Sequence, residues 1–151
     1  MRLTRSLLPL VLLAFALNAA DAAMWPLIPR VREDFNLSGL QVGLFFAAPT
    51  LVVLLTAVPV GQLGARFGSR WPLLAAAALI PVSLVTLALA QSLPVLLAGR
   101  LLFGLAFSAF WSLGPALAAS RVPGTRGSAV VMTAAGAGWL IAPLVAGVFE
   151  G

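Results

Sequence analysis

Two charged residues of opposite sign lie within otherwise apolar stretches of the sequence. Asp21 lies shortly before the end of a stretch that closes near Pro29, and Arg100 lies shortly after the start of another that opens near Pro94. At a helical rise of ~1.5 Å per residue, each lies about 10 Å inside its stretch. A lone charge at that depth costs about 2.5–3.5 kcal/mol on insertion scales, so such residues usually face a protein interior or a wet cavity. We therefore predict a polar centre in which Asp21 and Arg100 meet.

An aspartate beside an arginine can hold and release a proton. The guanidinium favours the ionised carboxylate, whereas a carboxylate that loses this partner in an apolar environment takes up a proton. A movement that separates Asp21 from Arg100 would then couple proton uptake to a change of shape. The alternative interpretation is an ion pair that only holds two helices together.

Polar and aromatic residues accompany both charges at helical spacings. Asn18 and Trp25 lie three residues before and four residues after Asp21, which predicts one shared face on a continuous helix. The neighbours of Arg100 at such spacings are Gly104, Phe107, Ser108 and Trp111. Such a face can line a cavity for an amphipathic or cationic solute. Ordinary packing of the aromatic rings is the alternative.

The composition is that of a membrane protein. Hydrophobic residues make up 62% of the 151 residues, charged residues 9%, and the mean hydropathy is +1.10. Soluble domains carry roughly 25% charged residues. The net charge of +5 comes from arginines scattered singly between apolar stretches, so we expect no nucleic-acid partner.

Residue usage argues against catalysis and metal binding. The chain contains no Cys, His or Lys, which removes disulfides, thiolates, imidazole ligands and imidazole bases. With Asp21 as the single well-buried acid, the usual nucleophile and metal constellations cannot be built. We therefore predict no enzyme activity, no cofactor and no metal site.

Five apolar stretches have about the ~20 residues that a transmembrane helix requires. They cover residues 7–29, 40–63, 71–90, 94–119 and 128–149. Short connectors predict antiparallel packing of sequential helices, with a polar connector over 30–38 and Ser38 as the N-cap of the second helix. The predicted fold class is an all-α integral membrane protein with about five transmembrane helices.

Alternate connectors differ in charge. One side of the predicted bundle carries Arg2, Arg5, Arg66, Arg70, Arg121 and Arg126. The other side carries Arg30 and Arg32, offset by Glu33 and Asp34, and also Glu150. The positive-inside rule therefore predicts a cytoplasmic N-terminus in the plasma (inner) membrane.

The first stretch also has the features of a secretory signal. Two arginines, an apolar run from Leu7 to Leu17 and the sequence Ala20-Asp21-Ala22 would suit a cleavable peptide. Pro9 and the apolar run that continues beyond Ala22 favour an uncleaved helix instead.

The connector after the second stretch resembles the signature loop of the major facilitator superfamily, G-x-L-x-D-R-x-G-R-R. The matching positions are Gly61, Leu63, Arg66, Gly68 and Arg70. The resemblance implies a cytoplasmic gate loop made by Gly61, Arg66, Gly68 and Arg70, in which Gly68 supplies the left-handed residue that ends a helix. Ala65 replaces the family's aspartate, so the latch to which that carboxylate contributes lacks this group here. A basic loop with a glycine stop is the alternative.

Three further segments resemble the same family, in the expected order. The first stretch ends Asp21-Ala22-Ala23-Met24-Trp25-Pro26-Leu27-Ile28-Pro29, similar to the family's acidic first helix with its closing P-x-x-P. Arg100 and Gly104 are similar to its R-x-x-x-G element. Gly138, Ala142, Pro143 and Gly147 are similar to the G-x-x-x-G-P-x-x-G-G element of the antiporter branches. Ala134, Gly138, Ala142 and Ala146 form a small-residue stripe, which predicts either a packing face or a bending helix.

The resemblance implies transport of a small solute by alternating access, with protons as the coupling ion. Among the branches of the family it favours drug/proton antiport. Major facilitators usually have two six-helix halves. This chain, with about five helices, is similar to an N-terminal portion without its sixth helix and C-terminal half, and we expect no transport by it alone. The alternative is a small membrane scaffold or accessory subunit without a solute path.

Overall fold

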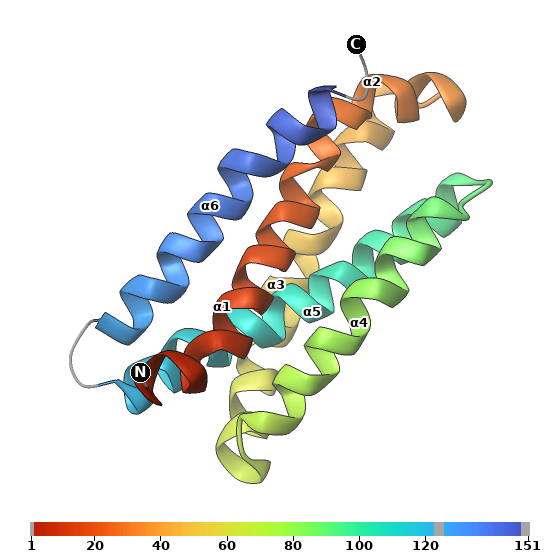
Figure 1. Cartoon of the computed structure of the whole chain (residues 1–151). Coiled ribbons are helices and arrows are strands. Elements are labelled where there is room, and N and C mark those ends of the chain that lie inside the picture. The colour runs from red at the N-terminus through yellow and green to blue at the C-terminus, as the bar shows by residue number, and fades with distance from the viewer. Residues whose placement is uncertain (1, 123–125, 149–151) are drawn as a thin grey trace. The chain divides into compact units, whose positions relative to one another are not determined.

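The computed structural model describes residues 2–122 and 126–148, and the side chains from residue 7 onward (Figure 1). The described residues form six helices and no strand. The helices are α1 (Arg2–Ala22), α2 (Met24–Asp34), α3 (Gly39–Phe67), α4 (Arg70–Ala88), α5 (Leu93–Arg121) and α6 (Arg126–Val148). By length and composition α3 to α6 can each cross a membrane, and α1 with α2 makes a fifth candidate span. The predicted all-α membrane fold class is confirmed.

The first predicted span is broken at Ala23. The sequence predicted one continuous helix over 7–29, but α1 ends at Ala22 and α2 begins at Met24, with a bend of 40° between them. Pro26 accounts for the break, because it has no N–H for the carbonyl of Ala22 and its ring crowds the preceding turn. The expectation of a continuous helix was wrong here. The helical conformation also extends beyond the predicted end of the span at Pro29, because α2 continues to Asp34.

A short turn joins α2 to α3. Asn36 has a positive φ of 51°, and Nε of Arg32 donates to the carbonyl oxygen of Leu37 at 3.4 Å. The Ser38 hydroxyl accepts from the Gln41 backbone N–H at 3.3 Å, while the Gln41 side chain accepts from the Ser38 N–H at 2.8 Å. This reciprocal pair is a capping box. Ser38 is thus the N-cap that the sequence predicted.

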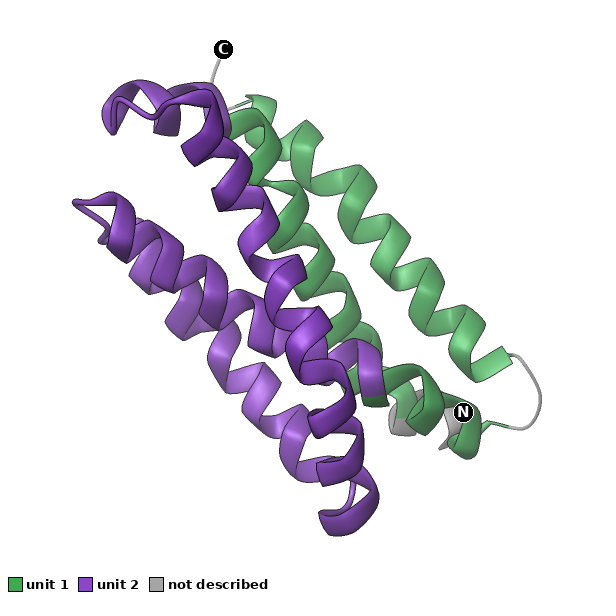
Figure 2. Cartoon of the chain, turned by 180° about the vertical axis from the view of Figure 1, so that it is seen from behind, with its two compact units in different colours: residues 1–27, 113–151 green, residues 28–112 purple. Residues whose placement is uncertain are grey.

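The chain forms two compact units (Figure 2). Unit 1 comprises residues 1–27 and 113–151. In this unit α1 and α6 lie side by side and run in the same direction (Figure 1). Gly138 permits this contact, because a Cβ at that position would lie 2.6 Å from the carbonyl oxygen of Phe15 and 2.9 Å from the nitrogen of Ala19. The small-residue stripe therefore packs against α1 at Gly138.

Unit 2 comprises residues 28–112, with most of α3, α4 and α5. The buried hydroxyl of Ser83 on α4 donates to the carbonyl oxygen of Gly99 on α5 at 2.9 Å. A Cβ on Gly99 would lie 2.7 Å from Cγ of Leu87, so α4 and α5 approach closely here. Interhelical hydrogen bonds and small residues are the usual means by which transmembrane helices associate.

Candidate functional site

Arg100 is a cation enclosed by aromatic rings within unit 2. It lies on α5 and is 2% exposed. Its guanidinium carbon lies 4.8 Å from the ring centroid of Phe45, 5.4 Å from that of Phe103 and 5.9 Å from that of Phe46. Ring faces attract a cation, and the attraction strengthens when both groups are desolvated. We call Phe45, Phe46 and Phe103 the aromatic cage of Arg100.

A main-chain carbonyl of α3 that lacks its helical hydrogen bond accepts a hydrogen bond from the Arg100 side chain. Nε of Arg100 donates to the carbonyl oxygen of Phe45 at 3.2 Å. In an α-helix this carbonyl would accept from the N–H of residue 49, but residue 49 is Pro49, which has no N–H. A Cβ on Gly104 would lie 2.8 Å from Cα of Pro49, so the two backbones are close at this level. The absent helical bond of α3 is thus replaced by a bond from α5.

Hydroxyl groups continue the contact between α3 and α5. Thr56 donates to the carbonyl oxygen of Val52 at 2.6 Å, and its oxygen lies in hydrogen-bond contact with the hydroxyl of Ser108 at 2.8 Å. Ser112 donates to the carbonyl oxygen of Ala57 at 3.4 Å. Ser108, predicted as a cavity residue, is 0% exposed in the structure.

An aromatic row follows Arg100 along α5. The ring centroids of Phe103 and Phe107 lie 5.8 Å apart, and those of Phe107 and Trp111 lie 5.9 Å apart. Nε1 of Trp111 is buried and has no hydrogen-bond partner among the described residues. Buried indole N–H groups usually have a partner. This donor is therefore a candidate for an acceptor that is not part of the described chain.

The other predicted residues lie in unit 1. Asn18 is buried, and its Nδ2 donates to the carbonyl oxygen of Ala14 at 2.8 Å. Asp21 is half-buried in the last turn of α1. Trp25 is 51% exposed and lies on α2, beyond the break at Ala23. The continuous face predicted for these three residues is therefore interrupted before Trp25, because Pro26 ends the regular helix.

The predicted site residues fall into two groups. Unit 2 holds Arg100 with Phe107, Ser108 and Trp111, and unit 1 holds Asp21 with Asn18 and Trp25. Because Asp21 and Arg100 belong to different units, their pairing stays a prediction.

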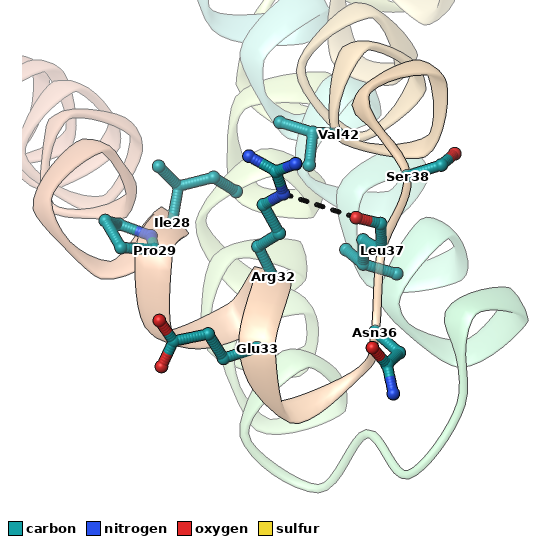
Figure 3. Close-up of a pocket in the computed structure, with 8 residues that line it drawn as sticks. All are labelled: Ile28, Pro29, Arg32, Glu33, Asn36, Leu37, Ser38 and Val42. Carbon is teal, nitrogen blue, oxygen red and sulfur yellow. Dashed lines mark hydrogen bonds between the residues drawn. The ribbon is translucent and has the colours of Figure 1, made fainter.

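A separate hollow of about 620 Å³ lies beside the α2–α3 turn (Figure 3). Its lining residues are Ile28, Pro29, Arg32, Glu33, Asn36, Leu37, Ser38 and Val42. In Figure 3 the Arg32 side chain extends past Leu37 toward Val42, and the Glu33 carboxylate points away from it. Arg32 and Ser38 both hold the turn together. These two polar side chains of the hollow thus serve the connection between α2 and α3.

Comparison with known families decides the class of protein. The sequence profile of the Major Facilitator Superfamily matches residues 10–149, which includes part or all of every helix. The chain belongs to the major facilitator superfamily. It is therefore a multi-pass membrane protein of a transporter family.

The major facilitator signature segment is mostly helical. α3 continues to Phe67, so Gly61 and Arg66 lie on the helix instead of in the predicted loop. Gly68 is the C-cap with φ 87° and ψ 144°, so the positive φ that ends the helix is confirmed. Arg66 is exposed, and its guanidinium carbon lies 5.6 Å from the ring centroid of Phe67. Arg70, also exposed, begins α4.

The major facilitator element in the last helix lies entirely within α6. Gly138 contacts α1, as described above. Ala142 and Pro143 are half-buried, and a Cβ on Gly147 would meet nothing within 4 Å. A hinge at Pro143 stays a prediction.

Sequence reasoning did not identify Phe45 and Phe46 as partners of Arg100, or Pro49 as the residue that leaves the Phe45 carbonyl without a helical donor. The signal in the sequence was a proline four residues after an aromatic residue inside an apolar stretch. That pattern predicts a carbonyl without its helical donor. It does not say which distant side chain provides the replacement, because this depends on how α3 and α5 pack.

Proposed function

We propose that the chain forms part of the solute path of a proton-coupled secondary transporter that works by alternating access. The observation that carries this proposal is the enclosed Arg100, a permanent charge with 2% exposure inside an apolar helix. Intramembrane charges of this kind mark solute or proton pathways. Membership in a transporter family supports the same function.

In this proposal Asp21 carries the proton and Arg100 controls it. While the two are near one another, the guanidinium keeps the carboxylate ionised. A rocking movement that separates them leaves the carboxylate without its counter-charge, and it takes up a proton. The proposed solute contacts are Asn18, Trp25, Phe107 and Trp111, whereas Ser108 is fully enclosed and would act indirectly, by holding Thr56 between α3 and α5.

Other features of the chain support a membrane orientation, a direction of transport and a second half of the carrier. The arginine-rich connectors support a cytoplasmic N-terminus in the plasma membrane and a cytoplasmic gate at Gly61, Arg66, Gly68 and Arg70. The Gly138–Gly147 element supports efflux by antiport, with Pro143 as a bending point. Since alternating access in this superfamily arises between two six-helix halves, we propose that a second half completes the carrier.

The decisive experiment compares Asp21→Asn with Asp34→Asn in the complete carrier, in vesicles that carry an imposed pH gradient. Ethidium, a cationic amphipathic dye, serves as the test solute, and a pH-sensitive fluorophore reports proton movement. We expect dye-driven proton release in the parent and in Asp34→Asn, because Asp34 is exposed on α2, and none in Asp21→Asn. Unchanged proton release in Asp21→Asn would refute the proposed coupling.

Thiol labelling separates a carrier from a scaffold. The chain has no cysteine, so a single introduced thiol is the only target. We expect Phe107→Cys to react with a charged aqueous thiol reagent, since Phe107 lies on the proposed cavity face. The exposed Val85→Cys on α4 is the lipid-facing control and should react only with a membrane-soluble reagent. Protection of Phe107→Cys from the charged reagent would favour the scaffold.

A further inference from the structure

An apolar groove lies between α3, α4 and α5 within unit 2, and neither Arg100 nor its cage contributes to its lining. Its volume is about 680 Å³. Leu63 and Phe67 of α3 face Trp71, Ala75 and Leu79 of α4 across it, and Leu105 of α5 contributes to the lining. Every residue that lines the groove has an apolar side chain.

The groove is open because small side chains form its floor and large ones its rim. Ala76 and Ala109 are buried at the bottom, whereas Phe67 and Trp71 are 62% and 69% exposed. From Trp71 to Leu79 the groove follows α4 for about 12 Å at 1.5 Å per residue. One leaflet contributes about half of the ~30 Å hydrocarbon core, so the groove matches most of the depth of one leaflet. This length suits an acyl chain.

Positive charge lies at one end of the groove. The Arg66 guanidinium lies over the ring of Phe67, and Arg70 directly precedes Trp71. No Asp or Glu occurs between residues 35 and 149, so α3, α4 and α5 contain no acid to balance these arginines. The N-terminus of α4 adds its partial positive charge, and its N-cap Ser69 makes no side-chain cap hydrogen bond. An apolar groove with a cationic end is complementary to an anionic lipid.

We propose that this groove is a binding site for an anionic phospholipid of the phosphatidylglycerol type. One acyl chain lies along Leu63, Phe67, Trp71 and Leu79, and the phosphate lies between Arg66 and Arg70. A basic side chain near an anionic surface contributes about fivefold in affinity, so the two arginines together give about twenty-five-fold preference over phosphatidylcholine. The site does not depend on the proposed proton coupling.

Brominated acyl chains test the proposal, because bromine quenches tryptophan fluorescence on contact and Trp71 lies in the groove. The full chain is placed in vesicles of fixed phosphatidylcholine and phosphatidylglycerol content, with bromine on one lipid or the other in equal amount. The difference between the parent and Trp71→Phe isolates the Trp71 signal from the three other tryptophans. We expect brominated phosphatidylglycerol to quench Trp71 more strongly than brominated phosphatidylcholine does.

Matched variants test whether the two arginines and the groove cause the stronger quenching by phosphatidylglycerol. The double substitution Arg66→Gln with Arg70→Gln should abolish the preference for phosphatidylglycerol, whereas Arg126→Gln, which changes an arginine outside this connector, should keep it.

Ala75→Phe fills the groove and should reduce quenching of Trp71 by phosphatidylglycerol. Ala78→Phe, exposed on the same helix but outside the groove, should not. Equal quenching by both lipids, or equal loss in Arg126→Gln, would overturn the proposal. Protection of Trp71 from both lipids would also overturn it, because another helix would then cover the groove.

Discussion

Nε of Arg100 donates to the main-chain carbonyl oxygen of Phe45 at 3.2 Å, across the contact between α5 and α3. This carbonyl has no helical donor, because Pro49 occupies the position from which the N–H would come. Buried main-chain acceptors are nearly always satisfied. Pro49 of α3 thereby leaves an acceptor that orients the Arg100 guanidinium of α5. The face of the Phe45 ring contacts the same guanidinium.

We predict energetic coupling between Pro49 and Arg100. Arg100→Lys should destabilise the chain by about 1–3 kcal/mol, since lysine lacks the planar fork that can donate to the carbonyl while it stacks on the rings. In a Pro49→Ala background the loss should be smaller by about 1 kcal/mol, because alanine in place of the proline would return a helical N–H to the Phe45 carbonyl. Unfolding in detergent of the parent, the two single variants and the double variant measures the coupling. Additivity within about 0.3–0.5 kcal/mol would contradict it.

Gly138 and Gly136 form a matched pair on α6. A Cβ at Gly138 would lie 2.6 Å from the Phe15 carbonyl oxygen, whereas a Cβ at Gly136 would meet nothing within 4 Å. Gly138→Ala should therefore destabilise the contact between α1 and α6 by about 1–3 kcal/mol, as overpacking does. Gly136→Ala should be neutral, or stabilising by up to about 1 kcal/mol through helix propensity. Thermal unfolding in detergent measures the stability change of each variant. Equal effects of the two substitutions would show that α1 does not pack closely on Gly138.

Trp111→Phe should leave the stability of the chain unchanged or raise it slightly. The substitution removes a buried N–H that has no partner among the described residues, and an unsatisfied donor costs about 1–3 kcal/mol. Trp139→Phe, at an exposed position of α6, is the control for the change of ring. A loss of more than about 1 kcal/mol in Trp111→Phe relative to Trp139→Phe would show that the indole already has a partner.

The helices were predictable because their signals are local. Long apolar stretches, the Ser38 cap with Gln41 three residues later, and Gly68 at the end of α3 all depend on neighbours in sequence. The break at Ala23 was missed although its cause is also local. Pro26 and Pro29 were assigned to the end of one span, whereas Pro26 interrupts the helix and α2 continues through Pro29.

The surroundings of Arg100 depend on tertiary packing. The sequence showed that a charge lay within an apolar helix, which requires stabilisation by other groups. Its carbonyl partner lies 55 residues away on α3, and no periodicity along α5 indicates it. The burial of Ser108 follows from the same packing, since its hydroxyl meets Thr56 between the helices.

The discontinuity at Ala23 has a mechanical consequence for the only acid of α1. Asp21 lies one residue before the end of α1, while the N–H of Ala23 still donates to the carbonyl oxygen of Ala19 at 2.9 Å. The last turn around the carboxylate is thus complete, and the bond from residue 26 to Ala22 is already absent because residue 26 is proline. The hydrogen bond from Ala23 to Ala19 therefore closes α1 just before α2 begins. The Asp21 carboxylate therefore lies in a complete last helical turn, directly before a 40° change of helix direction.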